Sequence, residues 1–157
     1  MKAQIYKIHS DFYYANLENS ISGLIECKLR EVLKKQKIKI KVGDFVEIDE
    51  NNAIISLLDR KNTLSRPQVS NLDIVAVVAS FLEPKIDFIQ LNRYLTFLKV
   101  HKIPAFICIN KDDLMEREDF IKAKEEIEKI YKPLGYDILY TSAILKDGIE
   151  EFKNYIK

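Results

Sequence analysis

The chain has 157 residues, of which 47% are hydrophobic and 31% are charged, and 25 basic and 24 acidic residues leave a formal net charge of +1. This composition is typical of a soluble globular protein with one or two small domains, and it argues against disorder and against a strong overall field for nucleic acid. No apolar run approaches the roughly 20 residues that span a bilayer, and the N-terminus lacks the apolar core of a signal peptide, so we expect a cytoplasmic protein with no membrane partner.

The first 66 residues are predicted to form five short strands, with no helix of useful length. Polar turns at 18–20 and 49–52 separate apolar runs, which cover residues 4–8, 12–17, 23–29, 38–48 and 53–58. Five strands in so few residues favour a small closed barrel of the oligonucleotide-binding (OB) type, and an SH3-like barrel fits nearly as well. We therefore place an all-β first domain at residues 1–66.

A basic stretch lies inside this domain. Residues 28–41 contain seven lysines or arginines and one acidic residue, and the lysines of 37–42 alternate with apolar residues, which places them on one face of a strand. Such a face could follow a phosphate backbone while an exposed aromatic ring stacks on a base, whereas the alternative is a solvated strand whose lysines discourage edge pairing. The candidate RNA-binding residues are Lys34, Lys35, Lys37, Lys39 and Lys41, and the candidate stacking rings are Phe12, Tyr13 and Tyr14.

From residue 67 onward the pattern changes to strands that alternate with helices. Apolar strands are predicted over 74–79, from residue 104 to 110 and over 137–141. Asp87 is placed to cap a first helix, a second is expected over 117–131, and a third over 148–156. The inward residues of the first two are predicted to be Phe88, Leu91, Leu95 and Leu98, and Phe120, Ala123, Ile127 and Ile130. This order predicts a partial α/β domain at 67–157 with a parallel, doubly wound sheet of only three strands.

The most informative motif is Asn110-Lys111-Asp112-Asp113, which directly follows a buried strand. The Asp113 carboxylate could accept hydrogen bonds from the ring N–H and the exocyclic amine of guanine, a donor pair that adenine lacks. Asn110 could brace the loop while the Lys111 stem covers the base. The alternative is a helix start, with Asp112 or Asp113 as the cap.

A second loop follows the next strand and supports this interpretation. Thr141-Ser142-Ala143 ends an apolar run, and the carboxyl ends of neighbouring parallel strands share one crevice, so the two loops could hold the same base. Without the first motif, Ser142 would be an ordinary loop or cap residue.

A phosphate-binding loop is not found in this sequence. Nucleotide hydrolases usually have Gly-x-x-x-x-Gly-Lys-Ser/Thr, but the four glycines here are too far apart to build one: Gly23, Gly43, Gly135 and Gly148. The two cysteines, Cys27 and Cys108, have strand-like apolar surroundings and are expected to be core thiols, and we assign no metal ligand. No catalytic residue can be assigned either.

The order of these features resembles the circularly permuted GTPases, and specifically the RsgA (YjeQ-like) family. The motifs that carry the resemblance occur in the family's order along the whole chain: 42–44 (Val-Gly-Asp), 60–62 (Arg-Lys-Asn), 66–67 (Arg-Pro), 71–73 (Asn-Leu-Asp), 110–114 (Asn-Lys-Asp-Asp-Leu) and 141–143 (Thr-Ser-Ala). Ile144 departs from the lysine that the family commonly has there, which weakens the expected cover over the base.

The resemblance implies a P-loop GTPase-like fold and a GTP-binding factor in late maturation of the small ribosomal subunit. It implies that the factor binds ribosomal RNA and GTP or GDP, and that the subunit stimulates GTP hydrolysis. Asn110, Lys111 and Asp113 would contact guanine, with Ser142 and Ala143 closing the site.

The resemblance also implies that the sequence stops before the phosphate loop. Magnesium and zinc would belong only to the longer protein, and we expect a monomer. Two alternatives are a non-enzymatic RNA-binding module with a vestigial nucleotide fold, and a structural fragment without a function of its own.

Overall fold

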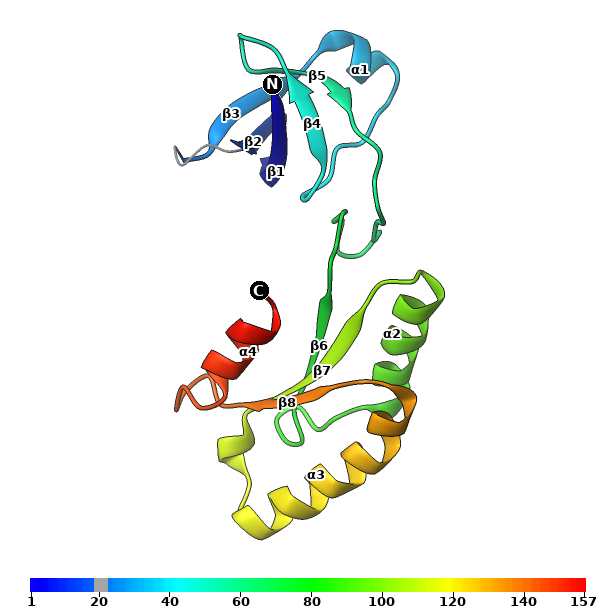
Figure 1. Cartoon of the computed structure of the whole chain (residues 1–157), viewed down its shortest axis with the longest axis vertical. Coiled ribbons are helices and arrows are strands. Elements are labelled where there is room, and N and C mark those ends of the chain that lie inside the picture. The colour runs from blue at the N-terminus through cyan, green and yellow to red at the C-terminus, as the bar shows by residue number, and fades with distance from the viewer. Residues whose placement is uncertain (19–22) are drawn as a thin grey trace. The chain divides into compact units, whose positions relative to one another are not determined.

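The computed structural model describes residues 1–18 and 23–157, which form two compact units, Met1–Leu72 and Asp73–Lys157 (Figure 1). Part of the turn predicted at 18–20 therefore lies outside the described residues. Within the described ranges, no helix is both long enough and apolar enough to cross a membrane.

The first unit is a closed five-stranded barrel, as predicted (Figure 1). Its strand order is β1-β2-β3-β5-β4. Strands β3 and β5 pair in parallel and the other neighbours pair antiparallel. Alternate residues of each strand point inward, and the barrel core includes Ala3, Ile5, Ala15, Val46 and Ile54, each no more than 1% exposed. The strands are β1 (Lys2–His9), β2 (Phe12–Leu17), β3 (Ile25–Leu29), β4 (Phe45–Ile48) and β5 (Ala53–Leu57).

The strand predicted over 38–48 is wrong in its first part, and a short helix was missed. Only β4 is a regular strand there, and Val42 forms an isolated bridge to Val69. Helix α1 (Glu31–Lys35) precedes this segment and packs Leu33 into the barrel core. Exposed and buried side chains still alternate in this segment, because Lys37 and Lys39 are exposed and Ile40 is buried. These lysines do not lie on the face of a paired strand, however.

The segment that follows β5 is fastened to the barrel by a buried ion pair. Asp44 is 0% exposed, and Arg60 donates to both of its carboxylate oxygens at 2.7 Å. The Ser70 hydroxyl and the Lys41 amide also donate to this carboxylate, at 2.5 and 2.7 Å. Burial by itself would raise the pKa of Asp44, but these hydrogen bonds lower it below its ordinary value.

Two asparagine side chains close the same segment. The Asn71 Nδ2 group donates to the Gly43 carbonyl at 2.8 Å, and Asn62 accepts from the Leu72 amide and donates to the Leu72 carbonyl, both at 2.8 Å. Residues 58–72 are therefore a structural part of the barrel unit.

The second unit is a three-stranded parallel sheet, as predicted, and its strand order is β6-β7-β8. Helices α2 and α3 pack on one face and α4 on the other (Figure 1). The elements are β6 (Val75–Ala79), α2 (Phe88–Val100), β7 (Ala105–Asn110), the 3₁₀ turn η1 (Asp112–Leu114), α3 (Arg117–Tyr131), η2 (Lys132–Leu134), β8 (Ile138–Thr141) and α4 (Ile149–Tyr155).

Helix α2 begins at the predicted cap, because the Asp87 carboxylate accepts from the Ile89 and Gln90 amides at 2.9 and 3.1 Å. Two predicted inward residues point elsewhere: Phe88 is 41% exposed and Ile130 is 50% exposed. Tyr131 is buried in place of Ile130, and its hydroxyl donates to Asn92 at 2.8 Å.

Candidate nucleotide-binding site

The two sequence motifs lie at neighbouring strand ends. Strands β7 and β8 pair in parallel with Asn110 opposite Thr141, so the loops that follow both strands leave the same edge of the sheet. This is the edge at which open α/β sheets bind ligands.

Asn110 connects the two loops through its side-chain oxygen. The Oδ1 atom accepts from the Thr141 hydroxyl at 3.1 Å and from the Ala143 amide at 3.2 Å. Thr141 is itself buried against Cys108, whose Sγ lies 3.5 Å from the Thr141 Oγ1. Asn110 thus holds the second loop in position.

Lys111 is held by a loop that sequence reasoning had not connected with the motif. Its backbone is left-handed, with φ of 65°, and its ammonium donates to the Glu83 carbonyl at 2.6 Å. Glu83 lies in the loop between β6 and α2, 28 positions away along the chain. A backbone acceptor leaves no trace in side-chain identity, so no sequence signal could have indicated this contact.

Neither aspartate of the motif caps helix α3. The helix begins after Glu116, while Asp112 and Asp113 lie in the 3₁₀ turn η1, so the capping alternative is wrong. Asp113 is exposed, and Asp112 is partly buried. Burial, followed by the charges of Asp147 and Asp113, raises the pKa of Asp112. Asp113 is therefore the carboxylate more open to a ligand.

The loop after β8 is stabilised by its own backbone. Ser142 is fully buried, its amide donates to the Asp147 carbonyl at 3.1 Å, and its hydroxyl accepts from the Leu145 amide at 3.0 Å. Ser142 thus supports the loop, whereas Ala143 and Ile144 are exposed.

Gly148 is a further structural requirement of this loop. Its φ is +66°, and a Cβ atom there would lie 2.0 Å from the Tyr140 carbonyl oxygen. Only glycine fits this close approach between the loop and β8. The Asp-Gly pair before the last helix was the sequence signal that could have revealed it.

The structure brings Asn110, Ser142 and Ala143 together, and Asp113 follows three residues after Asn110 on the exposed η1 turn. Chemically, this arrangement offers one ionisable acceptor and a backbone amide beside a braced loop. Such groups can form hydrogen bonds with the edge of a flat ring.

The candidate RNA-binding lysines of the barrel differ in the contacts that their ammonium groups make. Lys34 pairs with Glu31 at 3.0 Å, and the hydrogen bond from Lys34 to Glu31 raises the pKa of Lys34. Lys41 donates to the Thr63 hydroxyl at 2.6 Å and to the Leu64 carbonyl at 2.7 Å, so it fastens the segment after β5. The side chains of Lys35, Lys37 and Lys39 are exposed.

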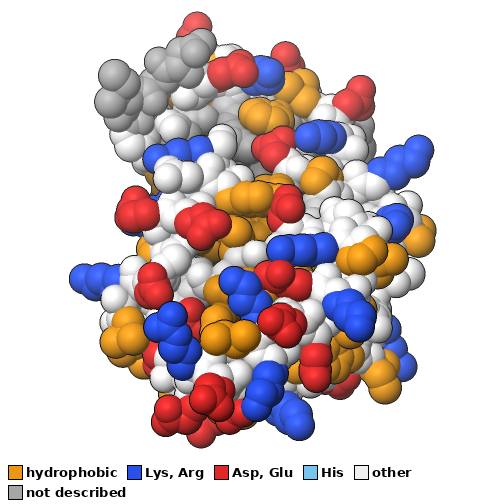
Figure 2. Space-filling view, turned by 60° about the horizontal axis from the view of Figure 1, so that its bottom comes forward, with side chains coloured by type: hydrophobic (Ala, Val, Ile, Leu, Met, Phe, Trp, Pro, Cys, Tyr) orange, Lys and Arg blue, Asp and Glu red, His pale blue; other side chains and the backbone are white. Residues whose placement is uncertain are grey.

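On the surface around α3, acidic and basic side chains are mixed (Figure 2). Figure 2 brings forward the side where α3 lies in Figure 1, and acidic and basic side chains are interspersed over that view of the described residues. Helix α3 carries charges of both signs, including Lys122 and Asp119, whose charged groups lie 3.9 Å apart. The described residues contain no group of three or more histidine, cysteine, aspartate or glutamate side chains that could hold a metal ion.

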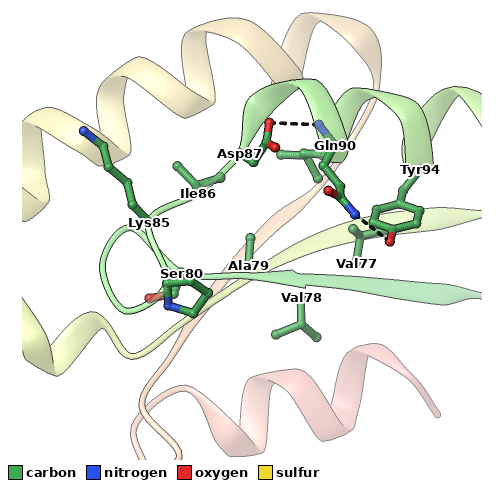
Figure 3. Close-up of a pocket in the computed structure, with 11 residues that line it drawn as sticks. Val77, Val78, Ala79, Ser80, Lys85, Ile86, Asp87, Gln90 and Tyr94 are labelled. Atoms are coloured by element: carbon green, nitrogen blue, oxygen red, sulfur yellow. Dashed lines mark hydrogen bonds between the residues drawn. The ribbon is translucent and has the colours of Figure 1, made fainter.

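A pocket of about 270 Å³ is lined by β6, by α2 and by the loop that joins them (Figure 3). Val77 and Val78 point to opposite faces of β6, and Tyr94 of α2 contributes to the lining. Gln90 donates to the Tyr94 hydroxyl at 3.0 Å. The lining is mainly apolar.

Comparison with known proteins matches residues 2–157 to two family models. The model described as the RsgA N-terminal domain matches residues 2–56, and the model described as RsgA GTPase matches residues 57–157. Relatives named small ribosomal subunit biogenesis GTPase RsgA include those of Caldanaerobacter subterraneus subsp. tengcongensis and Agathobacter rectalis, each 35% identical. The matches cover 93% and 100% of this chain but 48% and 55% of those proteins, so the chain spans about half the length of the curated relatives it matches.

Two solved structures have the same fold. YjeQ from Thermotoga maritima is 34% identical with a TM-score of 0.85, over 99% of this chain and 56% of that one. YloQ, described as a circularly permuted GTPase, is 33% identical with a TM-score of 0.73, over 90% of this chain and 51% of that one.

Proposed function

The chain belongs to the RsgA GTPase family, and we propose that it is the guanine-recognising and RNA-binding portion of a GTPase that acts in maturation of the small ribosomal subunit. Its partners are then guanine nucleotide, GTP or GDP, and the RNA of the small subunit. The name shared by the relatives supports the ribosomal role, and the geometry of the second unit supports the nucleotide.

The bridge that Asn110 forms between the two loops carries the nucleotide proposal. Because its Oδ1 atom binds Thr141 and Ala143, the loop after β8 is positioned before any ligand arrives. In our proposal, Asp113 accepts from the ring N–H and the amine of guanine, and the Ala143 region closes the opposite edge. The Lys111 stem covers the base while its ammonium stays on the Glu83 carbonyl.

A titration with nucleosides tests base recognition without requiring phosphate contacts. We expect guanosine to shift the backbone amide NMR signals of residues 110–113 and 142–145, and adenosine to leave them unchanged. Equal shifts with both nucleosides, or shifts confined to other residues, would contradict the proposed site. The control is a titration with buffer alone at the same pH. It is needed because the pKa of Asp112 beside the site is raised, so a change of pH could also shift nearby signals.

We propose that phosphate binding and hydrolysis depend on the part of the relatives' sequence that lies outside the region matched by this chain. The free edge of β6 supports this idea, because β6 is the last strand at one side of the described sheet and all five of its residues are apolar. One face of β6 is also uncovered, since Val78 is 62% exposed. An apolar edge strand is a template for another strand, and the apolar pocket in Figure 3 is lined in part by the same strand.

A binding experiment with the unmatched part of a relative tests whether another segment completes the sheet at the β6 edge. The separately expressed part of Thermotoga maritima YjeQ that the match leaves uncovered should bind this chain, and Val78→Lys should abolish that binding. Val100→Lys is the matched control, since Val100 is 72% exposed on α2. Equal binding by both variants would refute the role of the β6 edge.

The second candidate function is a non-enzymatic RNA-binding module, which the closed barrel and the exposed Lys35, Lys37 and Lys39 favour. It predicts salt-sensitive RNA binding in the absence of nucleotide. Neutralising Lys37 and Lys39 to Gln should weaken binding, whereas unchanged affinity would remove these lysines from the interface. Lys41 is a poor test position because its ammonium supports the fold.

A further inference from the structure

The outer face of the barrel carries two aromatic rings in the middle of a three-strand surface. Strand β2 lies between β1 and β3, and its Tyr13 packs against the barrel core. Since successive side chains of a strand alternate between faces, Phe12 and Tyr14 lie on the opposite, outer face. Both rings are half-buried, which holds them in place while leaving part of each accessible.

Each ring has a cation directly beside it on a neighbouring strand. Phe12 pairs in register with Lys28 of β3, whose ammonium lies 5.1 Å from the ring centroid. Tyr14 pairs in register with Lys7 of β1, whose ammonium lies 5.4 Å from the ring centroid. Both separations are within the range of cation–π attraction. We call Phe12, Tyr14, Lys7 and Lys28 the aromatic face.

One acidic residue also belongs to this surface. Glu26 is the β3 partner of Tyr14 and accepts a hydrogen bond from the Tyr14 hydroxyl at 3.3 Å. A carboxylate there repels phosphate, but it can accept hydrogen bonds from the amino groups of bases. The charge arrangement thus favours a base near Tyr14, with the phosphates beside the two lysines.

The spacing of the two rings selects the form of nucleic acid. Residues i and i+2 of a strand are about 7 Å apart, twice the roughly 3.4 Å rise between stacked bases in a duplex. Two rings at this spacing can each stack on one base of an extended strand, whereas a duplex keeps its bases stacked on each other. Rings on a strand with cations beside them are the platform by which barrels hold single strands.

We propose that the aromatic face binds two successive unstacked bases of a single-stranded RNA, with Phe12 and Tyr14 as the stacking rings and Lys7 and Lys28 as phosphate contacts. This inference rests on the RNA-binding part of the proposed function. It assigns the base contacts to a surface separate from Lys34, Lys35, Lys37, Lys39 and Lys41, which then serve at most the phosphate backbone.

Fluorescence anisotropy with a labelled single-stranded RNA of about eight nucleotides tests the proposal, since barrels of this type bind roughly 4–16 nucleotides. We expect Phe12→Ile and Tyr14→Ile each to weaken binding about five- to 150-fold, because isoleucine suits a strand but has no π-face. Tyr14→Phe keeps the ring and should bind like the unaltered chain. Tyr94→Ile is the matched control, because Tyr94 is 52% exposed on α2 of the other unit.

The lysines provide a test that does not alter the rings. Lys7→Gln and Lys28→Gln should each make binding less sensitive to salt, lowering the slope of log affinity against log salt by about 0.7. Thermal unfolding of every variant shows whether a loss of binding reflects a loss of the fold. If a ring variant does not fold, the two lysine variants test the proposal in its place.

The outcomes distinguish this inference from the function on which it rests. If the unaltered chain binds no RNA, the RNA-binding proposal and this inference both fail. If it binds RNA and the Ile and Gln variants bind equally well, the aromatic face is refuted while RNA binding stands. Equal affinity for a blunt-ended duplex of two RNA strands would also refute the inference, because such a duplex keeps its bases stacked on each other.

Discussion

At the scale of single residues, Asp113 is the side chain on which base preference is proposed to depend. An amide in place of its carboxylate can no longer accept from both guanine donors, but it can donate to the carbonyl that xanthine has in place of the amine. We expect Asp113→Asn to lose binding of guanosine and to gain binding of xanthosine. Nucleoside titration followed by NMR measures both.

The control for that exchange is Asp119→Asn. Asp119 is an exposed carboxylate on α3, and its pairing with Lys122 at 3.9 Å is loose. This variant should retain the preference for guanosine. A preference for guanosine that persists in Asp113→Asn would remove Asp113 from the role proposed for it.

We expect Asp44 to make the stability of the barrel unit sensitive to acid. Its pKa is lowered from the ordinary 3.8, so its contribution to stability is complete above that value and is lost as pH falls through the lower folded-state pKa. We expect the free energy of unfolding of the barrel to decrease below about pH 4, and Asp44→Asn to reduce this pH dependence.

At neutral pH, Asp44→Asn should destabilise the barrel by about 3 kcal/mol, because it leaves Arg60 beside a neutral group in a partly buried site. Denaturant unfolding at pH 7 and pH 3.5 measures both effects. Asp49, whose pKa is also lowered, by hydrogen bonds from the Ala53 and Asn51 amides, leaves some acid sensitivity in the variant. An unchanged pH profile would refute the contribution of Asp44.

At the scale of elements, the loop between β8 and α4 depends on Gly148. Alanine there would place a methyl group against the Tyr140 carbonyl, and its backbone would have to adopt the left-handed conformation that is unfavourable for residues with a side chain. The loop must therefore shift. We expect Gly148→Ala to destabilise the second unit by about 1–3 kcal/mol and to weaken guanosine binding through displacement of Ala143.

Gly135→Ala is the matched control for this effect. Its φ is +84°, but nothing lies within 4 Å of the added Cβ atom, so only backbone strain of about 1 kcal/mol is expected. Guanosine binding should then be unchanged. If the two variants affect guanosine binding equally, the close approach at Gly148 does not position the loop.

The elements that sequence predicted well are those with local signals. Helix α2 was predicted from the cap at Asp87, and α3 was placed at 117–131 from its apolar period and from the proline and glycine that follow it. The motif at Asn110 was placed correctly at a strand end because an uninterrupted apolar run precedes it.

The predictions that failed depended on distant contacts. Residues 38–44 alternate like a strand, but the Lys41 amide binds the Asp44 carboxylate instead of a neighbouring strand. The pairing of Asp44 with Arg60 joins positions 16 apart, which no local pattern reports. Likewise, Tyr131 replaces Ile130 as the inward residue because its hydroxyl reaches Asn92 of another helix.

At the scale of the whole molecule, three observations divide the chain at different places. The change in strand and helix pattern along the sequence predicted a boundary after residue 66, the family models meet between 56 and 57, and the compact units divide between 72 and 73. The position at which the barrel can fold by itself is therefore a measurable property of the segment that follows β5.

We expect residues 1–72 to fold as a more stable barrel than residues 1–66, because the last six residues supply contacts that the shorter form lacks. Ser70 donates to the buried Asp44 carboxylate at 2.5 Å, and Asn71 donates to the Gly43 carbonyl at 2.8 Å. Without them, the carboxylate keeps Arg60 but loses one of its buried donors, at a cost of about 1–3 kcal/mol. Denaturant unfolding of the two forms measures the difference. Ser70→Ala in the longer form should reproduce part of the loss, and equal stability of all three would place the end of the folding unit at residue 66 instead.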